Sequence, residues 1–205
     1  GISYDEKTQT LIGSNLFAAA KIDSLVRPFG IRVANPRDLS RPEVMALVKD
    51  KHYTDAPALV LRSINEGYAR NLPIINQIVQ VVEKKEGKLQ LPIMISGFDV
   101  KVDENTGDYE IAFVPREDFK AVHDERLKRE YHGKKFSEVD EFGLPKFDVN
   151  GSRTWYTRSD GLARFYLDSY LDLDSNDDYL QNSNSYGRVV LVSAEGTAKT
   201  LESKL

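Results

Sequence analysis

The chain has 205 residues, of which 40% are hydrophobic and 10% aromatic, and its formal net charge is −4. This composition is sufficient for a buried core, while the absence of cysteine excludes disulfides, Cys-ligated metals and thiol nucleophiles. Acidic and basic residues are interspersed, which argues against nucleic-acid binding, and no apolar run approaches the ~20 residues of a membrane span. No signal-like segment opens the chain, so we expect a soluble protein.

Short strands and helices alternate in the first half of the chain. Residues 8–12 are predicted to form a strand, and residues 14–26 a helix that is capped by Ser14 or Asn15. Residues 40–43 fit a capping box for a helix at 42–50, and a strand follows at 58–62. A third helix is predicted to end at 84–88. The expected inner faces are Ala18, Ile22, Leu25 and Val26 in the first helix, and Ile75, Ile78, Val79 and Val82 in the third.

Strands dominate the prediction for the second half. Residues 91–102 and 109–114 are expected to pair through a loop at 103–108, and a polar helix is expected at 117–129. Residues 130–150 form a charged connection. Two strands around a tight turn at 159–161 and a last strand complete the prediction, at 152–158, 162–167 and 188–193. We therefore expect one α+β domain over residues 1–205, with a frayed tail at 194–205.

Residues 166–186, here called the tract, have an unusual composition. Sixteen of these twenty-one residues are Asp, Asn, Ser or Tyr, and Lys, Arg, Glu, Gly and Pro are absent. The remaining residues are Gln181 and four leucines. We expect the leucines to hold the tract against the rest of the protein, because Leu171 and Leu173 alternate with Asp172 and Asp174 as in a half-buried strand. The predicted scaffold positions are Leu167, Leu171, Leu173, Leu180 and Gly187.

Alternating oxygen-bearing side chains in the tract raise the possibility of a calcium site. Asp172, Asp174, Asn176 and Asp178 have the spacing of a calcium loop. The sixth position of such a loop needs a glycine and the twelfth a bidentate glutamate, however, and the chain has Asp177 and Ser183 there. The three histidines also lack metal-ligand spacing. We predict no metal and no cofactor, and keep a calcium-dependent or carbohydrate-binding module that uses Asp172, Asp174 and Asn176 as the alternative.

The genetic code offers an explanation for the composition of the tract. Asn codons that end in a pyrimidine become Asp, Ser or Tyr codons by one change at an adenine, whereas Lys, Glu, Met and Trp cannot be reached in this way. Tyr, Ser and Asn are also the residues favoured in antibody combining sites, where rigid aromatic rings anchor and small polar groups adapt. The composition therefore indicates an ordered recognition surface whose codons derive from Asn codons.

Residues 144–192 resemble the variable proteins of diversity-generating retroelements. The similarity lies in Leu144-Pro145, the segment from Thr154 to Arg158, the segment 161–167, the Asn-like tract and the segment 187–192, and it is greatest to the archaeal and archaeal-virus branch. In that family, an error-prone copy of a template repeat replaces the variable region of the gene. The resemblance implies a C-type lectin fold with small antiparallel sheets and flanking helices but without disulfides or calcium. It also implies a variable region at 162–190 and display on a virion or a cell surface.

Carried over position by position, the resemblance implies thirteen diversified ligand contacts: Asp168, Ser169, Tyr170, Asp172, Asp174, Asn176, Asp177, Asp178, Tyr179, Asn182, Asn184, Ser185 and Tyr186. Gln181 departs from the codon pattern and is expected to be fixed, whereas Tyr166, Ser175 and Ser183 fit either role. The expected function is noncatalytic recognition of a surface ligand, most plausibly a protein. Because the tract has five aspartates and no lysine, we expect a basic patch on the partner. The oligomeric state is left open.

An enzyme is the remaining alternative. The C-type-lectin-fold sulfatase-activating oxygenases need cysteine, which this chain lacks. A hydrolase built on the paired carboxylates of Asp177 and Asp178 stays formally open, but neighbouring acids in an acidic segment are usually solvated. We therefore assign no catalytic residue.

Overall fold

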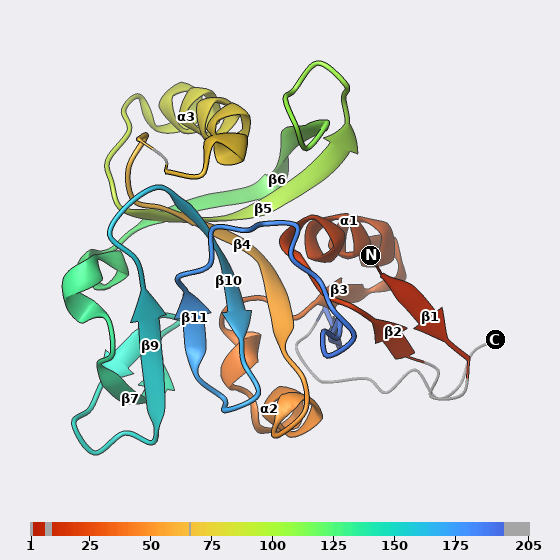
Figure 1. Cartoon of the computed structure of the whole chain (residues 1–205), viewed down its shortest axis with the longest axis vertical. Coiled ribbons are helices and arrows are strands. Elements are labelled where there is room, and N and C mark those ends of the chain that lie inside the picture. The colour runs from red at the N-terminus through yellow and green to blue at the C-terminus, as the bar shows by residue number, and fades with distance from the viewer. Residues whose placement is uncertain (1, 7–9, 66, 195–205) are drawn as a thin grey trace.

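The computed structural model describes residues 2–6, 10–65 and 67–194, and these residues form a mixed α+β structure (Figure 1). Within them, an eight-stranded sheet has the order β6-β5-β4-β10-β11-β9-β7-β8, and β1 with β2 and β3 with β12 form two-stranded sheets. The helices are α1 (Leu16–Val26), α2 (Pro42–Val48) and α3 (Leu72–Glu86), with 3-10 turns at Arg27–Phe29, Asp38–Ser40, Ala69–Asn71, Glu125–Leu127 and Arg129–Tyr131. The strands are β1 (Ser3–Asp5), β2 (Thr10–Ile12), β3 (Ile31–Val33), β4 (Thr54–Leu61), β5 (Ile93–Val102), β6 (Ile111–His123), β7 (Lys135–Val139), β8 (Pro145–Phe147), β9 (Arg153–Thr157), β10 (Leu162–Leu167), β11 (Leu173–Ser175) and β12 (Leu191–Ser193).

The centre of the eight-stranded sheet is buried on both faces, as the alternation along β4 shows. Leu59 and Leu61 belong to one hydrophobic cluster, together with residues of α1, α3 and β5. Ala58 and Val60 belong to a second cluster on the opposite face, together with residues of α2, β9 and β10. Successive side chains of a strand point to opposite faces, so every residue of β4 is buried. Figure 1 shows α3 lying along β5 and β6.

Locally encoded elements agree with the sequence prediction. The helical spacing in residues 75–82 is that of α3, whose buried residues include Ile75, Ile78 and Val82. The loop at 103–108 joins β5 to β6, which pair antiparallel from Val102 and Ile111 to Ile93 and His123. The predicted strand at 58–62 is the second half of β4, and that at 8–12 corresponds to β2 at its described positions.

The predicted polar helix at 117–129 is wrong. β6 continues to His123, and 3-10 turns follow. The first half of β5 needs a partner, and Lys120 pairs with Ser96 there. Phe119 and Ala121 pack against one cluster while Val122 packs against the other, which is the two-residue period of a strand. The high charge of the segment concealed this alternation.

Two predictions about helices need correction. Ser40 does not cap α2, because its hydroxyl accepts a hydrogen bond from Nη1 of Arg153 at 2.7 Å. α1 is capped by Asn15, whose side chain accepts from the amide of Ala18. Its inner face is not the predicted one, since Asp23 is buried and accepts from the amide of Val33 at 2.9 Å. That bond fixes the rotation of the helix, and the residues buried with Asp23 are Leu16, Ala19 and Ala20.

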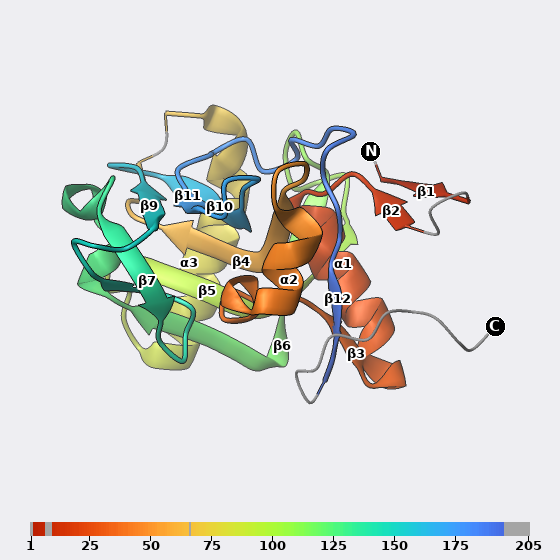
Figure 2. The ribbon, with the colours of Figure 1, turned by 90° about the horizontal axis from the view of Figure 1, so that it is seen from below.

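The end of the chain is connected differently from the prediction. The strands on either side of the turn at 159–161 exist as β9 and β10, but β11 lies between them, antiparallel to β10 and parallel to β9. The main sheet is therefore larger than expected and includes a parallel pair. The charged connection at 130–150 contains β7 and β8. β12 pairs with β3 away from the main sheet, as Figure 2 shows, and residues 195–205 of the predicted tail lie outside the described residues.

Candidate functional site

The tract contributes to two strands of the main sheet and then runs over one of its faces. It starts in β10, turns at 168–172 into β11, and then crosses the sheet as residues 176–186, here called the crossing segment (Figure 1). Leu180 of this segment packs in the same cluster as residues of α1 and α3. The crossing segment therefore lies on the face of the sheet that carries these two helices.

The framework, meaning the residues outside the tract, holds the crossing segment mainly by its backbone. The side chain of Asn71, just before α3, donates to the carbonyl of Asp178 at 2.9 Å. Asn15, the cap of α1, donates to the carbonyl of Gln181 at 3.4 Å. The amide of Asn184 donates to the hydroxyl of Tyr53 at 3.2 Å. These three contacts do not depend on which side chains stand at positions 178, 181 and 184.

Asp and Asn side chains shape the bends of the tract. Asp168, Asp174, Asp177 and Asn184 each accept a hydrogen bond through Oδ1 from the amide two residues later, at 2.6 to 2.9 Å. Such Asx turns supply a bend without help from a helix or sheet. Asp168 also accepts from the amide of Asp172 at 2.9 Å. The abundance of Asp and Asn thus has a structural cause in addition to the codon pattern.

Arg164 of β10 connects the crossing segment to the core. Its side chain is buried, and Nη1 contacts the buried carboxylate of Asp55 at 3.0 Å. On the other side, Nη2 contacts Asp177 at 2.8 Å. Ser14 completes the group by donating to Asp55 at 2.7 Å. Burial raises the pKa of Asp55, and the positive charge of Arg164 opposes that rise.

Asp174 lies beside this group in a half-buried position. Burial raises its pKa to about 6, which the hydrogen bonds from the Asn176 amide and from Tyr166 oppose. Burial likewise raises the pKa of Tyr166, whose ring stacks under the guanidinium of Arg164 at 4.4 Å. Asp174 and Tyr166 therefore bind to each other and to the framework.

Framework arginines balance much of the negative charge of the tract. Arg158 contacts Asp178 at 2.6 Å, in addition to the Arg164–Asp177 pair. Burial lowers the pKa of Arg153 to about 10, against the attraction of Asp172 and Asp168. A basic patch on the partner was expected because the tract has five aspartates and no lysine, but arginines outside the tract compensate part of this charge. The charge of the tract therefore favours a basic partner less than its composition indicated.

The exposed side chains of the tract are chiefly Tyr and Asn. Tyr170 is 83% exposed, Tyr186 65% and Tyr179 39%. Tyr179 contacts the ring of Tyr68 edge to face, with the centroids 5.4 Å apart. The other exposed residues of the tract are Asn176, Gln181, Asn182, Asn184 and Ser185. Ser169, Asp168, Asp172, Asp174, Asp177 and Asp178 are half-buried.

The loop between α2 and β4 binds the backbone of the tract at two places, Ser169 and Tyr186. The amide of Asp50 donates to the carbonyl of Ser169 at 2.8 Å, next to Tyr170. The amide of Tyr53 donates to the carbonyl of Tyr186 at 3.2 Å. Tyr170 and Tyr186 therefore flank residues 50–53, and Tyr179 lies at the opposite end of the crossing segment, beside Tyr68.

The predicted scaffold positions are buried or half-buried. The same holds for Tyr166, Ser175 and Ser183, the three positions that fit either role. Leu167, Leu173 and Leu180 are completely buried and Gly187 is buried, whereas Leu171 is half-buried with a φ of 70°. Ser175 is also completely buried, and its hydroxyl accepts from Nη2 of Arg62. The hydroxyl of Ser183 accepts from the amide of Ser14 at 3.1 Å. A Cβ at position 187 would lie 2.4 Å from the Ser14 nitrogen, so this position requires glycine.

Sequence reasoning missed the framework side of the site. The missed residues are Ser14, Tyr53, Asp55, Arg62, Tyr68, Asn71, Arg153, Arg158 and Arg164. One signal was available: an arginine in the middle of the otherwise apolar strand 162–167 implies a buried carboxylate partner. The identity of that partner, Asp55, was not readable, because 109 positions separate the two residues.

The calcium alternative gains no support from the geometry. Oδ1 of Asp172 accepts from the amide of Thr154, whereas Oδ1 of Asp174 accepts from the amide of Asn176. Across residues 2–6, 10–65 and 67–194, no three His, Cys, Asp or Glu side chains are grouped as a metal ion would require. Asp177 and Asp178 also bind different arginines rather than each other.

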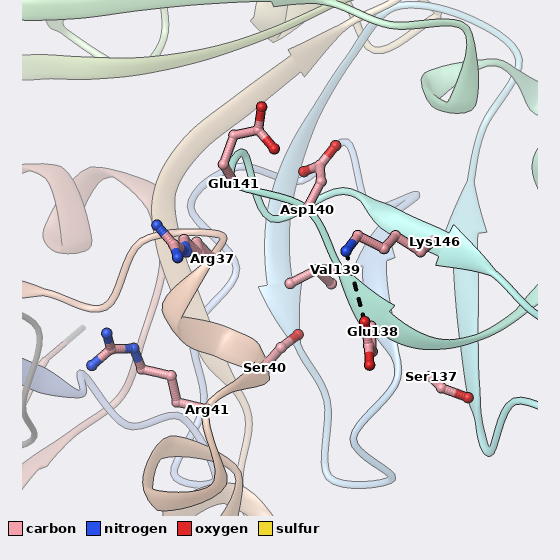
Figure 3. A pocket seen from close by; sticks show the side chains of 9 residues that line it. All are labelled: Arg37, Ser40, Arg41, Ser137, Glu138, Val139, Asp140, Glu141 and Lys146. Carbon is pink, nitrogen blue, oxygen red and sulfur yellow. Dashed lines mark ion pairs between the residues drawn. The ribbon is translucent and has the colours of Figure 1, made fainter.

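One hollow lies away from the tract. It has a volume of about 520 Å³ and lies between the 3-10 turn at Asp38–Ser40 and the β7–β8 hairpin (Figure 3). Lys146 faces Glu138 across 3.6 Å, and Arg41 contacts Asp38 at 3.1 Å. No tract residue lines this hollow, and these two cations already have partners.

No family model matches the chain, and no curated protein or solved structure is significantly similar to it. In the part of the chain that the structure describes, no helix is long and apolar enough to cross a membrane.

Proposed function

We propose that the protein is a noncatalytic ligand-binding protein whose recognition surface is the tract, and that adenine-directed copying from a template repeat diversifies this surface. The observation that carries the proposal is that different residues of the tract have different surroundings. Its backbone and aspartates bind the framework, while Tyr170, Tyr179 and Tyr186 project into solvent. An ordered surface with exposed tyrosines is typical of a combining site.

The proposed ligand is a protein surface. A tyrosine provides a large contact area with only two side-chain torsions, which makes it a common anchor at interfaces. Because Arg158 and Arg164 pair with Asp178 and Asp177, aromatic contact rather than net charge supplies most of the affinity in this proposal. A basic patch on the ligand adds to it only near the other aspartates.

The C-type lectin fold and display on a virion or a cell surface belong to the same proposal. The mixed α+β structure is compatible with this fold. The resemblance of residues 144–192 supports the fold more specifically.

The test is the DNA of the encoding locus. The codons of residues 168–186 are compared with any near-identical repeat and with neighbouring reverse transcriptase genes. We expect a repeat that differs from these codons almost solely where the repeat has adenine. Codons that end freely in any base, without such a repeat, would refute diversification.

A further inference from the structure

A second, smaller hollow lies within the proposed recognition surface, where β9 and β11 end. Its volume is about 390 Å³, and its lining combines tract and framework residues: Arg129, Arg158, Ser159, Asp160, Asn176 and Asp178. The hollow is therefore lined by two tract positions that we propose to vary, 176 and 178, and by framework residues outside the tract.

Arginines converge on this hollow. Arg129 is held by a bond from Nη1 to the carbonyl of Thr157 at 2.9 Å. Arg62 is buried and donates through Nη1 to the carbonyl of Ser175 at 2.9 Å. Burial lowers the pKa of Arg62 to about 9, and the neighbouring charge of Arg158 lowers it further. Arg62 does not line the hollow, but Arg129 and Arg158 do, and two guanidinium groups there favour an anion as their common partner.

Asp178 already supplies such an anion. Its carboxylate contacts Nη1 of Arg158 at 2.6 Å, while Asp160 contacts Nη2 of the same residue at 3.2 Å. The backbone of position 178 is fixed independently, because its carbonyl accepts from Asn71. Replacing the aspartate by Asn or Ser therefore removes the carboxylate and leaves the hollow in place.

We propose that this hollow is a carboxylate-binding subsite of the recognition surface, which Asp178 occupies from within the chain and which opens when position 178 is uncharged. The ligand group is the carboxylate of an acidic side chain on the partner. This inference rests on the proposed function and extends it: one residue in the tract decides whether the surface rejects or accepts an acidic group.

The experiment uses the whole chain with Asp178→Asn, and Asp178→Ser as a second variant. The probes are a blocked tripeptide with a central Glu and the same peptide with Gln. Each peptide is titrated into the protein, and binding is followed by the shift of the Arg158 Nε–H NMR signal. We expect both variants to bind the Glu peptide about tenfold more tightly than the wild type, and to show no shift with the Gln peptide. The exposed Arg129→Gln, added to Asp178→Asn, should reverse the gain, because it removes a cation that lines the hollow and keeps the Arg158 signal.

Asp108→Asn is the matched control, because Asp108 forms a surface pair with Arg70 at 3.3 Å outside the hollow. Equal gains in Asp108→Asn and Asp178→Asn would overturn the proposal, as would equal affinity of the wild type and both Asp178 variants. Tighter binding of inorganic phosphate than of the Glu peptide would overturn the assignment to a carboxylate. These probes need neither the natural partner nor a template repeat, so failure here is distinguishable from failure of the proposed function.

Discussion

Arg164 contacts Asp55 in the core and Asp177 in the crossing segment with one guanidinium group, at 3.0 and 2.8 Å. A buried charge between two carboxylates is costly to remove from one side only, because the groups left behind stay desolvated. The stability of the fold and the position of the crossing segment therefore depend on the same side chain.

Arg164→Met should lower the free energy of unfolding by about 3 to 5 kcal/mol, because Asp55 would be left buried without its cation. Urea denaturation measures this difference. Arg37→Met is the control, since Arg37 is exposed and should change stability by at most about 0.5 kcal/mol. A loss below about 1 kcal/mol for Arg164→Met would show that the fold accommodates an uncompensated Asp55.

Tyr170→Ala together with Tyr179→Ala should weaken ligand binding by about 2 kcal/mol or more if these rings are anchors. Tyr170 is 83% exposed, so its loss should leave folding unchanged, whereas Tyr179 also gives up its ring contact with Tyr68, worth about 0.5 to 1.5 kcal/mol. Calorimetry with a selected ligand measures the affinity. Tyr4→Ala is the control, because Tyr4 is an exposed tyrosine in β1, outside the tract. Undiminished affinity in the double variant would refute the anchor assignment.

Leu173→Ala should cost about 2 to 5 kcal/mol of stability, because Leu173 is completely buried in the cluster with Trp155 and Phe165. Leu171→Gly should cost less, since Leu171 is half-buried and its φ of 70° suits glycine. Thermal and chemical denaturation compare the two variants. The opposite ranking would mean that Leu171, rather than Leu173, holds the bend of the tract.

The free energy of unfolding of the Asp174→Asn variant should increase relative to that of the wild type as the pH rises. The pKa of Asp174 is about 6 in the folded protein and about 3.9 in the unfolded chain. The contribution of its neutral form is complete below pH ~4 and is lost as the pH rises through 6. Asn cannot ionise, so the difference in free energy of unfolding should grow by on the order of 2 to 3 kcal/mol between pH 4 and 7.5.

Urea titrations at both pH values measure this difference, with Glu104→Gln as an exposed control. The charged groups that act on Asp174 are Asp177, which raises its pKa, and Arg164, which lowers it. A difference that does not vary with pH would show that Asp174 is as well solvated in the folded protein as in the unfolded chain.

The parts of the fold that are readable from the sequence are those determined by near neighbours. The apolar spacing of α3 and the β5–β6 hairpin with its Asn- and Gly-containing loop were predicted because each depends on residues close in sequence. The continuation of β6 to His123 depends on β5, and the rotation of α1 depends on a bond between Asp23 and β3. Composition and local periodicity carry no information about such partners.

In the candidate site too, features that depend on near neighbours were predictable and contacts between distant positions were not. The composition of the tract indicated exposed tyrosines and buried leucines, and the structure has three exposed tyrosines and three completely buried leucines there. It could not indicate which aspartates bind arginines, because those contacts join distant positions. Arg62 and Ser175, for example, are 113 positions apart.

The place of β11 in the sheet has a consequence for the order of events during synthesis. β10 and β9 are both made before residue 173, yet neither pairs with the other, and only the three residues of β11 join them. Among the described strands, β11 is the link between the groups β6-β5-β4-β10 and β9-β7-β8. β11 thus completes the main sheet after the strands on both sides of it have been made, and under the proposed diversification every version of the tract must still form these pairs.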